Sequence, residues 1–389
     1  MRGDVATIAQ ATGVGVGAWW EALDGAIAGA GAVEGVDIAF LFAHSSFAPH
    51  FGEIAATANE KLGAKHVIGC AGQGLIATGR EIEHEPAIVV MSVRVANGTF
   101  TPIRLEAGRP ALPIDRPDGV TAWLLFGDPY TLDGESTLER LNAAYPGRPV
   151  IGGMASANEG PRNTAVFLDG IAYPDGAVAI AIGGDAGIHI TVSQGCLPIG
   201  QPWIITSVRD NLIETIAGRP AVEMLTDTLR GLDEETRRRA QANLLVGLAM
   251  DEYRDQHGMG DFLIRNLLGY EKETGALAIS ALPQSGQTVQ FQYRDARAAG
   301  EHLRQQLMTL RERMGGEKAS AALLCSCNGR GSQLFGPIDH DPAAIAEAFG
   351  DIPVAGLFCA GEIGPVGARN FLHGFTATIA LFTKRPTGS

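Results

Sequence analysis

Leu323-Leu324-Cys325-Ser326-Cys327-Asn328-Gly329-Arg330-Gly331 opens the stretch of sequence that decides the fold. Its apolar start predicts a buried strand, and the polar, Gly-flanked residues that follow predict a loop at the end of that strand. A helical pattern comes next, with Asp341 as the expected N-cap and Gly350 as the stop. Two further apolar runs, 353–357 and 376–383, complete the order strand, loop, helix, strand, loop, strand.

The same order of elements occurs twice earlier in the chain. The corresponding apolar runs are 36–42, 66–70 and 87–93 in the first copy, and 120–126, 149–153 and 176–182 in the second. A unit that recurs three times is a repeat and not a coincidence of composition. The sequence therefore predicts an α/β fold, with β-sheets and flanking helices built from repeated β-loop-α-β-loop-β units in two similar halves packed together.

The length and composition predict a multidomain globular protein. A chain of 389 residues exceeds one ordinary core, and a hydrophobic content of 46% with 19% charged residues is typical of folded domains. An amphipathic pattern near 18–30 predicts a short helix at the start. We expect an N-terminal helical segment over 1–35, one domain over 36–220 and a second over 221–389. Residues 71–85 are expected to form a long polar loop.

Charge and hydropathy restrict the classes of partner. The net charge of −13 argues against nucleic acid, because phosphate binding needs a basic face. No run approaches the roughly 18 apolar residues that span a bilayer, and no signal-peptide pattern is present. Five scattered cysteines fit reduced thiols. We expect a cytoplasmic protein without membrane insertion.

Several segments carry a more specific pattern, in an order that matches a known family: Pro149-Val150-Ile151-Gly152-Gly153, Gln194-Gly195-Cys196-Leu197-Pro198-Ile199-Gly200, Leu263-Ile264-Arg265-Asn266, Cys327-Asn328-Gly329-Arg330-Gly331, Gly361-Glu362-Ile363-Gly364-Pro365 and His373-Gly374-Phe375-Thr376. In these segments the chain resembles FIST domain proteins, with a FIST N half followed by a FIST C half. The resemblance extends over roughly residues 36 to 382.

This resemblance implies an intracellular sensory module that binds small ligands such as amino acids. Family members occur alone, or fused to or encoded beside bacterial signalling proteins, so a separate signalling protein such as a kinase or cyclase is the expected partner. Some bacterial relatives are haem-binding nitric-oxide sensors, which makes haem an alternative cofactor.

Three arginines and one acid in the C-terminal half are candidate ligand contacts. Arg265, Arg294 and Arg330 carry planar forks that bind carboxylates through two parallel hydrogen bonds. Arg330 follows a buried strand, where α/β sheets bind their ligands. Asp295 lies beside Arg294. The alternative for Arg294 and Asp295 is a structural role, in which they cap the next helix and pair with neighbours.

Glu362, Asn370 and His373 complete the expected ligand site. Glu362 lies between glycines and is suited to an ammonium group, so that Glu362 and an arginine together match an amino-acid zwitterion. The alternative is an incidental acid in a surface turn. His373 is either structural or an iron ligand in a noncovalent haem site, since no Cys-Xaa-Xaa-Cys-His segment is present. No other metal site is predicted.

Cys327 is the candidate for thiol chemistry. Arg330 is a possible cause of a lowered pKa at this thiol, and His373 is the candidate base. The sequence assigns no catalytic residue and favours a binding protein over an enzyme. The hypotheses, in order, are a sensor of a small polar ligand, a haem-dependent gas sensor, a thiol enzyme and a pure scaffold.

Overall fold

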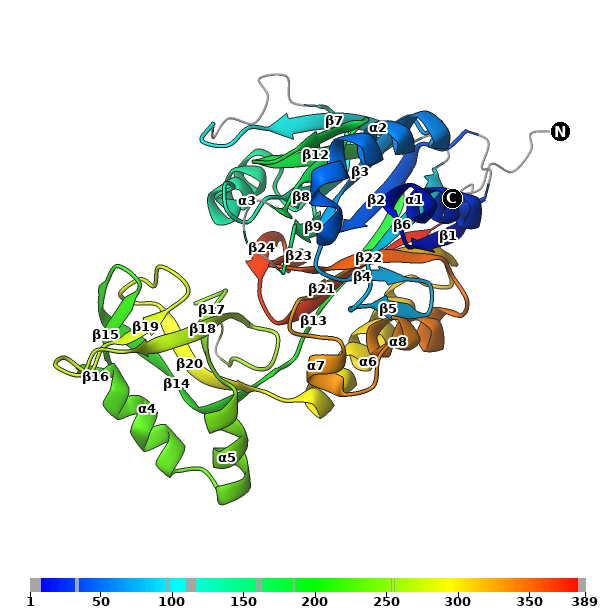
Figure 1. Ribbon diagram of the computed structural model, residues 1–389. Helices are drawn as coiled ribbons and strands as arrows, with labels where there is room; N and C mark the ends of the chain where they lie inside the picture. Colours follow the sequence, from blue (N-terminus) through cyan, green and yellow to red (C-terminus); the bar gives the residue numbers. More distant parts are fainter. Residues whose placement is uncertain are drawn as a thin grey trace. The chain divides into compact units, whose positions relative to one another are not determined.

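The structure is a computed structural model, and it describes residues 8–31, 35–95, 98–109, 117–158, 160, 163–184, 186–252, 254 and 256–383, with only the backbone for residues 8–11. The fold is mixed α/β (Figure 1), as predicted. The chain forms two compact units. Unit 1 comprises Met1–Val192, Leu303–Leu372 and Thr376–Ser389, and unit 2 comprises Ser193–His302 and His373–Phe375.

Unit 1 contains, among its described residues, three six-stranded sheets with equivalent strand orders. The first sheet runs β1 (Ile8–Val16), β6 (Ala87–Arg94), β2 (Ile38–His44), β3 (His66–Gly72), β10 (Val166–Leu168), β11 (Ile171–Tyr173). The second runs β7 (Gly98–Leu105), β12 (Ala177–Gly184), β8 (Val120–Gly127), β9 (Val150–Met154), β23 (Glu362–Val366), β24 (Arg369–His373). The third runs β13 (Gly187–Gln194), β25 (Thr376–Thr383), β21 (Ala319–Cys327), β22 (Val354–Cys359), β4 (Leu75–Ala77), β5 (Arg80–Ile82).

The three predicted copies are confirmed by the pairing of their strands. In each copy the first strand is parallel to the second and antiparallel to the third: β2 with β3 and β6, β8 with β9 and β12, and β21 with β22 and β25. The short hairpin that interrupts each copy adds to a different sheet. β4–β5 of the first copy joins the third sheet, β10–β11 of the second joins the first, and β23–β24 of the third joins the second. The exchange is cyclic, which ties the three copies into one unit.

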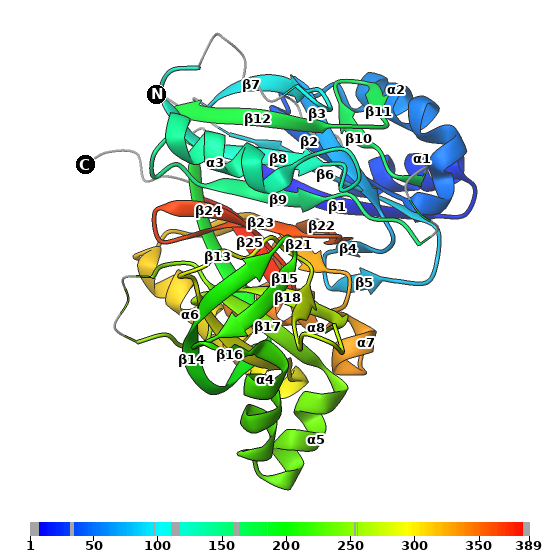
Figure 2. The same cartoon turned by 90° about the vertical axis from the view of Figure 1, so that its left-hand side faces the viewer.

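Helices cover the outer face of each sheet (Figures 1 and 2). α1 (Trp19–Ala30) and α2 (Phe51–Leu62) pack on the first sheet, with η1 (Ser45–His50) leading into α2. α3 (Gly134–Ala144) packs on the second. On the third, α8 (His340–Phe349) packs beside the part of α6 (Ala296–Arg313) from Leu303 onward, and α7 (Ser332–Phe335) precedes α8. Apart from the short α7, which has no buried residue, these helices bury their apolar residues against the sheet that they cover.

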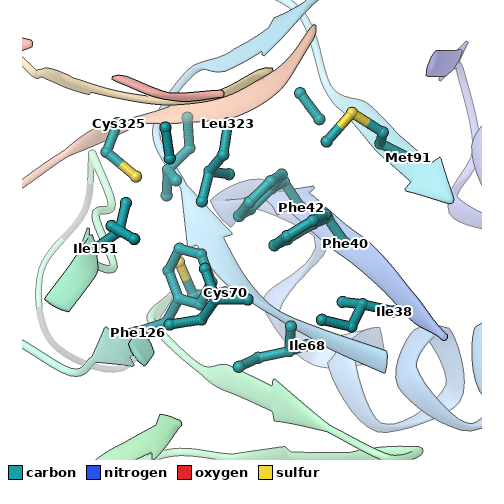
Figure 3. Close-up of a cluster of buried hydrophobic side chains, with 14 of the residues drawn as sticks. Ile38, Phe40, Phe42, Ile68, Cys70, Met91, Phe126, Ile151, Leu323 and Cys325 are labelled. Atoms are coloured by element: carbon teal, nitrogen blue, oxygen red, sulfur yellow. The ribbon is translucent and has the colours of Figure 1, made fainter. Parts of the chain in front are cut away.

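The inner faces of the three sheets share one hydrophobic core (Figure 3). The Phe42 and Phe126 rings lie 5.5 Å apart and connect the first sheet to the second. Phe40 and Phe382 lie 5.8 Å apart and connect the first sheet to the third. These four rings are essentially inaccessible to solvent. The strands are buried on both faces, which explains why they read as continuous apolar runs.

One glycine recurs at the same place in all three copies. Gly69, Gly152 and Gly356 on the second strands lie opposite Leu41, Leu125 and Leu324 on the first strands. A Cβ atom at any of them would lie 1.8 Å from the carbonyl oxygen of that leucine. The parallel strands therefore approach each other only because these residues lack a side chain.

Three expectations need correction. The N-terminal segment is not only helical, because strand β1 precedes α1; its Gly13 and Gly15 hide the strand pattern and pack against the α1 backbone. Residues 1–7 and 32–34 of that segment lie outside the described residues. The expected loop over 71–85 contains the β4–β5 hairpin, whose strands are too short for a period to show. The N-cap of α8 is Asp339, and Asp341 lies inside the helix.

Unit 2 is an antiparallel sheet with two helices. Its strand order is β14 (Cys196–Arg209), β20 (Thr288–Arg294), β17 (Leu244–Ala249), β18 (Phe262–Tyr270), β19 (Leu277–Ile279), β15 (Leu212–Ile216), β16 (Arg219–Pro220). α4 (Ala221–Arg230) and α5 (Glu234–Ala242) contribute to its core. In the described part of the chain, no helix has the length and apolar character needed to cross a bilayer.

Candidate functional site

Arg330 is one of two charged residues among the predicted site residues that are fully buried; the other is Glu362. Arg330 sits in the turn after β21, where its backbone N–H donates to the carbonyl of Cys327 at 2.8 Å, and its side chain is fully buried. Nε and Nη2 donate to the two carboxylate oxygens of Asp341, both at 2.8 Å. The guanidinium also lies 5.1 Å from the ring centroid of Phe335. Asp341 thus occupies the guanidinium fork of Arg330, which the sequence predicted would bind a ligand carboxylate. The remaining nitrogen of Arg330, Nη1, has no hydrogen-bond partner among the described residues.

The charges around Arg330 hold this pair ionised. Burial by itself would raise the pKa of Asp341, but the adjacent guanidinium and the hydrogen bonds from Arg330 and His340 hold that pKa well below its usual range. Burial opposes the charge of Arg330 as well, and Asp341 more than offsets it, so the pKa of Arg330 is raised. The pair anchors the loop after β21 to α8.

Glu81 closes the same network from the β4–β5 hairpin. Its carboxylate accepts hydrogen bonds from the backbone N–H groups of Asp339 at 2.8 Å and Asp341 at 3.2 Å, at the start of α8. Burial first, and the charge of Asp341 second, raise the pKa of Glu81 to about 7. A hairpin of the first copy therefore caps a helix of the third through a group that titrates near neutral pH.

Glu362 and Cys327 lie in the same unit as Arg330. Glu362 is fully buried and accepts hydrogen bonds from the backbone N–H of Thr376 at 3.1 Å and from its hydroxyl at 2.8 Å. The charges of Cys327 and Glu362 both act on Arg330. Cys327 is half-buried at the end of β21. The structure thus brings three predicted residues together, with Glu362 joining β23 to the start of β25.

The other predicted residues, apart from Asn370, belong to unit 2. Arg265 is buried in β18, and its Nη1 donates to the carbonyl of Ile264 at 3.0 Å. The guanidinium of Arg294 lies 5.2 Å from the ring centroid of Phe375. Asp295 accepts from the backbone N–H of Ala298 in the first turn of α6 at 2.9 Å and pairs with Arg239 at 3.1 Å. Asp295 therefore fills the structural role named as its alternative.

Two more buried polar residues belong to unit 2: His373, which the sequence predicted as a site residue, and Gln292, which it did not. His373 ends β24 and is 3% exposed. Gln292, next to Tyr293 on β20, is 1% exposed, and neither polar atom of its amide has a hydrogen-bond partner among the described residues. Gln292 lies within strand β20, and its residue type alone does not distinguish it from an ordinary sheet residue. A buried amide with free hydrogen-bonding capacity is the signal that only coordinates give.

Asn370 clamps the turn between α3 and β9. Its Oδ1 accepts from the backbone N–H of Val150 at 2.7 Å, and its Nδ2 donates to the carbonyl of Arg148 at 2.9 Å and to Oδ1 of Asn142 at 2.8 Å. The amide is 3% exposed and fully used in these bonds. Asn370 thus holds β24 of the third copy against the second copy.

A pocket of about 300 Å³ opens beside this clamp, entirely within unit 1. The α3–β9 turn, strand β13, the last turns of α6 and the β23–β24 turn supply its walls. The lining residues are Gly147, Arg148, Pro149, Ile188, His189, Ile190, Leu310, Arg313, Pro365, Gly367, Ala368 and Asn370. Its volume lies at the small end of the range for ligand sites.

Of the predicted residues, only Asn370 lines this pocket. Arg148 and Arg313 were missed, because a turn before a strand and the exposed end of a helix are usually solvated. Gly147 and Pro149, which flank Arg148, mark a turn of fixed shape. This turn was the only feature of the sequence that could have pointed to Arg148, and no feature pointed to Arg313.

Two family models match the chain in tandem: the FIST N domain over residues 37–219 and the FIST C domain over residues 221–365. The uncharacterized protein Mb0898c of Mycobacterium bovis is 37% identical over 380 residues, which is 95% of this chain and 98% of the relative. The uncharacterized protein Rv0628c of Mycobacterium tuberculosis is 39% identical over 323 residues, 81% of this chain and 83% of the relative. The two matched domains together cover most of the chain, and so do the alignments with these relatives. The chain therefore belongs to the FIST family.

Proposed function

We propose that this protein is a sensory protein of signal transduction that binds a small polar ligand in the pocket of unit 1. FIST domains are associated with sensory functions in signal transduction. The observation that carries the proposal is the pocket itself, with a volume of about 300 Å³ and a lining that combines apolar and cationic residues. Such a lining is typical of small-molecule sites.

The construction of the pocket supports a role in sensing. Its walls come from the second copy, through the α3–β9 turn, from the third copy, through the β23–β24 turn, and from β13 and α6, which precede the third copy in the chain. The Asn370 hydrogen bonds fix one of these turns. A ligand that contacts elements of two copies changes the free energy of their association, which a separate signalling partner can read.

A thermal-shift screen tests this proposal. We expect at least one class among amino acids, dicarboxylates and phosphorylated metabolites to raise the melting temperature, because a ligand that binds only the folded protein stabilises it. Replacing the exposed pocket residue Ala368 with Trp should abolish that shift by filling the pocket.

Ala28→Trp, at an exposed position on α1 outside the pocket lining, is the matched control and should keep the shift. The proposal fails if no compound stabilises the wild-type protein, or if Ala368→Trp responds as strongly as Ala28→Trp.

A further inference from the structure

We infer that the ligand of this pocket is a compact dianion, a small molecule whose two negative charges are carried by carboxylate or phosphate groups. The inference rests on the proposed function of the pocket and specifies its ligand. It follows from the charges of the lining residues, from their hydrogen-bond partners and from the size of the pocket.

Arg148 is presented to the pocket on a fixed backbone. Its N–H donates to the carbonyl of Tyr145 at 3.1 Å, and its own carbonyl accepts from Asn370 at 2.9 Å. Gly147, at φ +70°, makes the turn before it. The guanidinium itself has no hydrogen bond or ion pair with any described residue. Two hydrogen bonds therefore fix the backbone of an exposed arginine that lines the pocket and whose guanidinium has no carboxylate partner among the described residues.

Arg313 supplies a second cation from a different element. It belongs to the last turn of α6, and its Nη2 donates to the backbone carbonyl of Ile190 at 3.3 Å. No carboxylate among the described residues pairs with it. The bond to Ile190 directs the guanidinium along the β13 wall, while its other donors stay available to a ligand.

His189 contributes an imidazole ring to the pocket, and its acidic partner, Glu317, also accepts a hydrogen bond from Thr383. Nε2 of His189 lies 3.0 Å from Oε2 of Glu317, and the same oxygen accepts from the hydroxyl of Thr383 at 2.8 Å. Glu317 is not a lining residue. Among the described residues that line the pocket there is no Asp or Glu, although the chain has 43 acidic residues against 30 Lys and Arg.

These charges select against a zwitterion. An amino acid needs an acceptor for its ammonium group, and the described residues of the lining offer two guanidinium groups and no carboxylate. Two arginine forks instead match two anionic groups, each through parallel charge-assisted hydrogen bonds. The small volume favours a compact molecule over a nucleotide.

Titration calorimetry with four probes tests the inference: succinate, inorganic phosphate, acetate and glycine. We expect succinate or phosphate to bind the full chain, acetate and glycine to bind at least tenfold more weakly, and the binding to weaken as salt increases. Binding of succinate alone assigns dicarboxylates as the source of the charge, and binding of phosphate alone assigns phosphate compounds.

Variants connect the binding to the pocket. Arg148→Gln and Arg313→Gln should each weaken the preferred probe by about tenfold or more, because each removes a charge-assisted contact. Arg304→Gln is the matched control, since Arg304 lies on the same helix, is exposed, pairs with Glu347 and does not line the pocket. Ala368→Trp provides a second, uncharged block that leaves both arginines in place.

The outcomes separate the two proposals. Glycine binding that Ala368→Trp abolishes, with no dianion binding, overturns the dianion and keeps the proposed function. Dianion binding that survives both arginine variants also overturns the inference. Failure of all four probes overturns it, and the wider metabolite screen then decides whether the pocket binds any ligand.

Discussion

Glu81 shows how one residue connects distant parts of unit 1. It comes from the β4–β5 hairpin, is 6% exposed, and receives two backbone N–H groups at the start of α8. Next to it, Asp341 is held ionised by Arg330. Two acids so close together in a buried site do not ionise equally, and Glu81 is the one that holds its proton more tightly.

This arrangement predicts a pH dependence of stability. The pKa of Glu81 rises from the ordinary value of 4.5 to about 7 in the folded protein. Between these values the unfolded chain has lost this proton and the folded protein keeps it, so the free energy of unfolding falls as the pH rises from 4.5 to 7. The loss amounts to about 3 kcal/mol and is complete about one pH unit above the folded pKa.

Urea unfolding at several pH values, on the wild type and on Glu81→Gln, measures this contribution. Glutamine has the shape of the protonated acid and does not titrate, so the wild type should lose stability relative to the variant between pH 5 and 7.5. Comparing the two curves cancels the remaining groups. Parallel curves, or a wild type that gains stability relative to the variant as pH rises, would contradict the assignment.

At the scale of elements, each copy of the repeat depends on the close approach of two parallel strands. Gly356 lies opposite Leu324, as Gly69 and Gly152 lie opposite their own leucines. Three residues beyond each leucine the chain carries His44, Asp128 or Cys327. The backbone position is thus kept in every copy, while the polar chemistry at the strand end differs from copy to copy.

Gly356→Ala tests the strand approach. A Cβ atom placed 1.8 Å from the carbonyl oxygen of Leu324 must push β22 away from β21, and we expect the free energy of unfolding to fall by about 3 kcal/mol or more. Gly52→Ala is the matched change, because a Cβ atom there, in α2, meets no atom within 4 Å. It should be neutral or slightly stabilising. Equal effects of the two changes in thermal or urea unfolding would refute the packing argument.

At the scale of the whole of unit 1, three sheets share one core and exchange their hairpins in a cycle. No single copy holds all the strands of its own sheet. The Phe42–Phe126 contact is one of the aromatic contacts between sheets. We therefore expect the three copies of unit 1 to unfold as one cooperative body, although their sequences form separate repeats.

Phe42→Ala should reveal this cooperativity. Loss of a buried ring costs about 3–5 kcal/mol, and native-state hydrogen exchange should show faster exchange in β2, β8 and β21 together. Ile171→Ala, at a position 53% exposed on β11, should change stability by less than about 0.5 kcal/mol. Faster exchange confined to the first sheet would show that the copies unfold independently.

The sequence by itself determined the repeat. Strands buried on both faces appear as short apolar runs, and helix stops such as Gly63 and Gly350 mark the ends of α2 and α8. These signals are local, and so the three copies, most of their strands and the family could be predicted. The β4–β5 hairpin and β1 were not predicted, because three-residue strands and Gly-rich strands show no hydrophobic periodicity.

Only the tertiary structure decided which polar side chains meet. Arg330 and Asp341 are close in sequence, but nothing in the sequence shows that helix α8 places the Asp341 carboxylate against the guanidinium of Arg330. Arg148 and Arg313 are 165 positions apart and line the same pocket. Side-chain chemistry at a site depends on contacts between remote segments, and those contacts arise only when the sheets have closed around their common core.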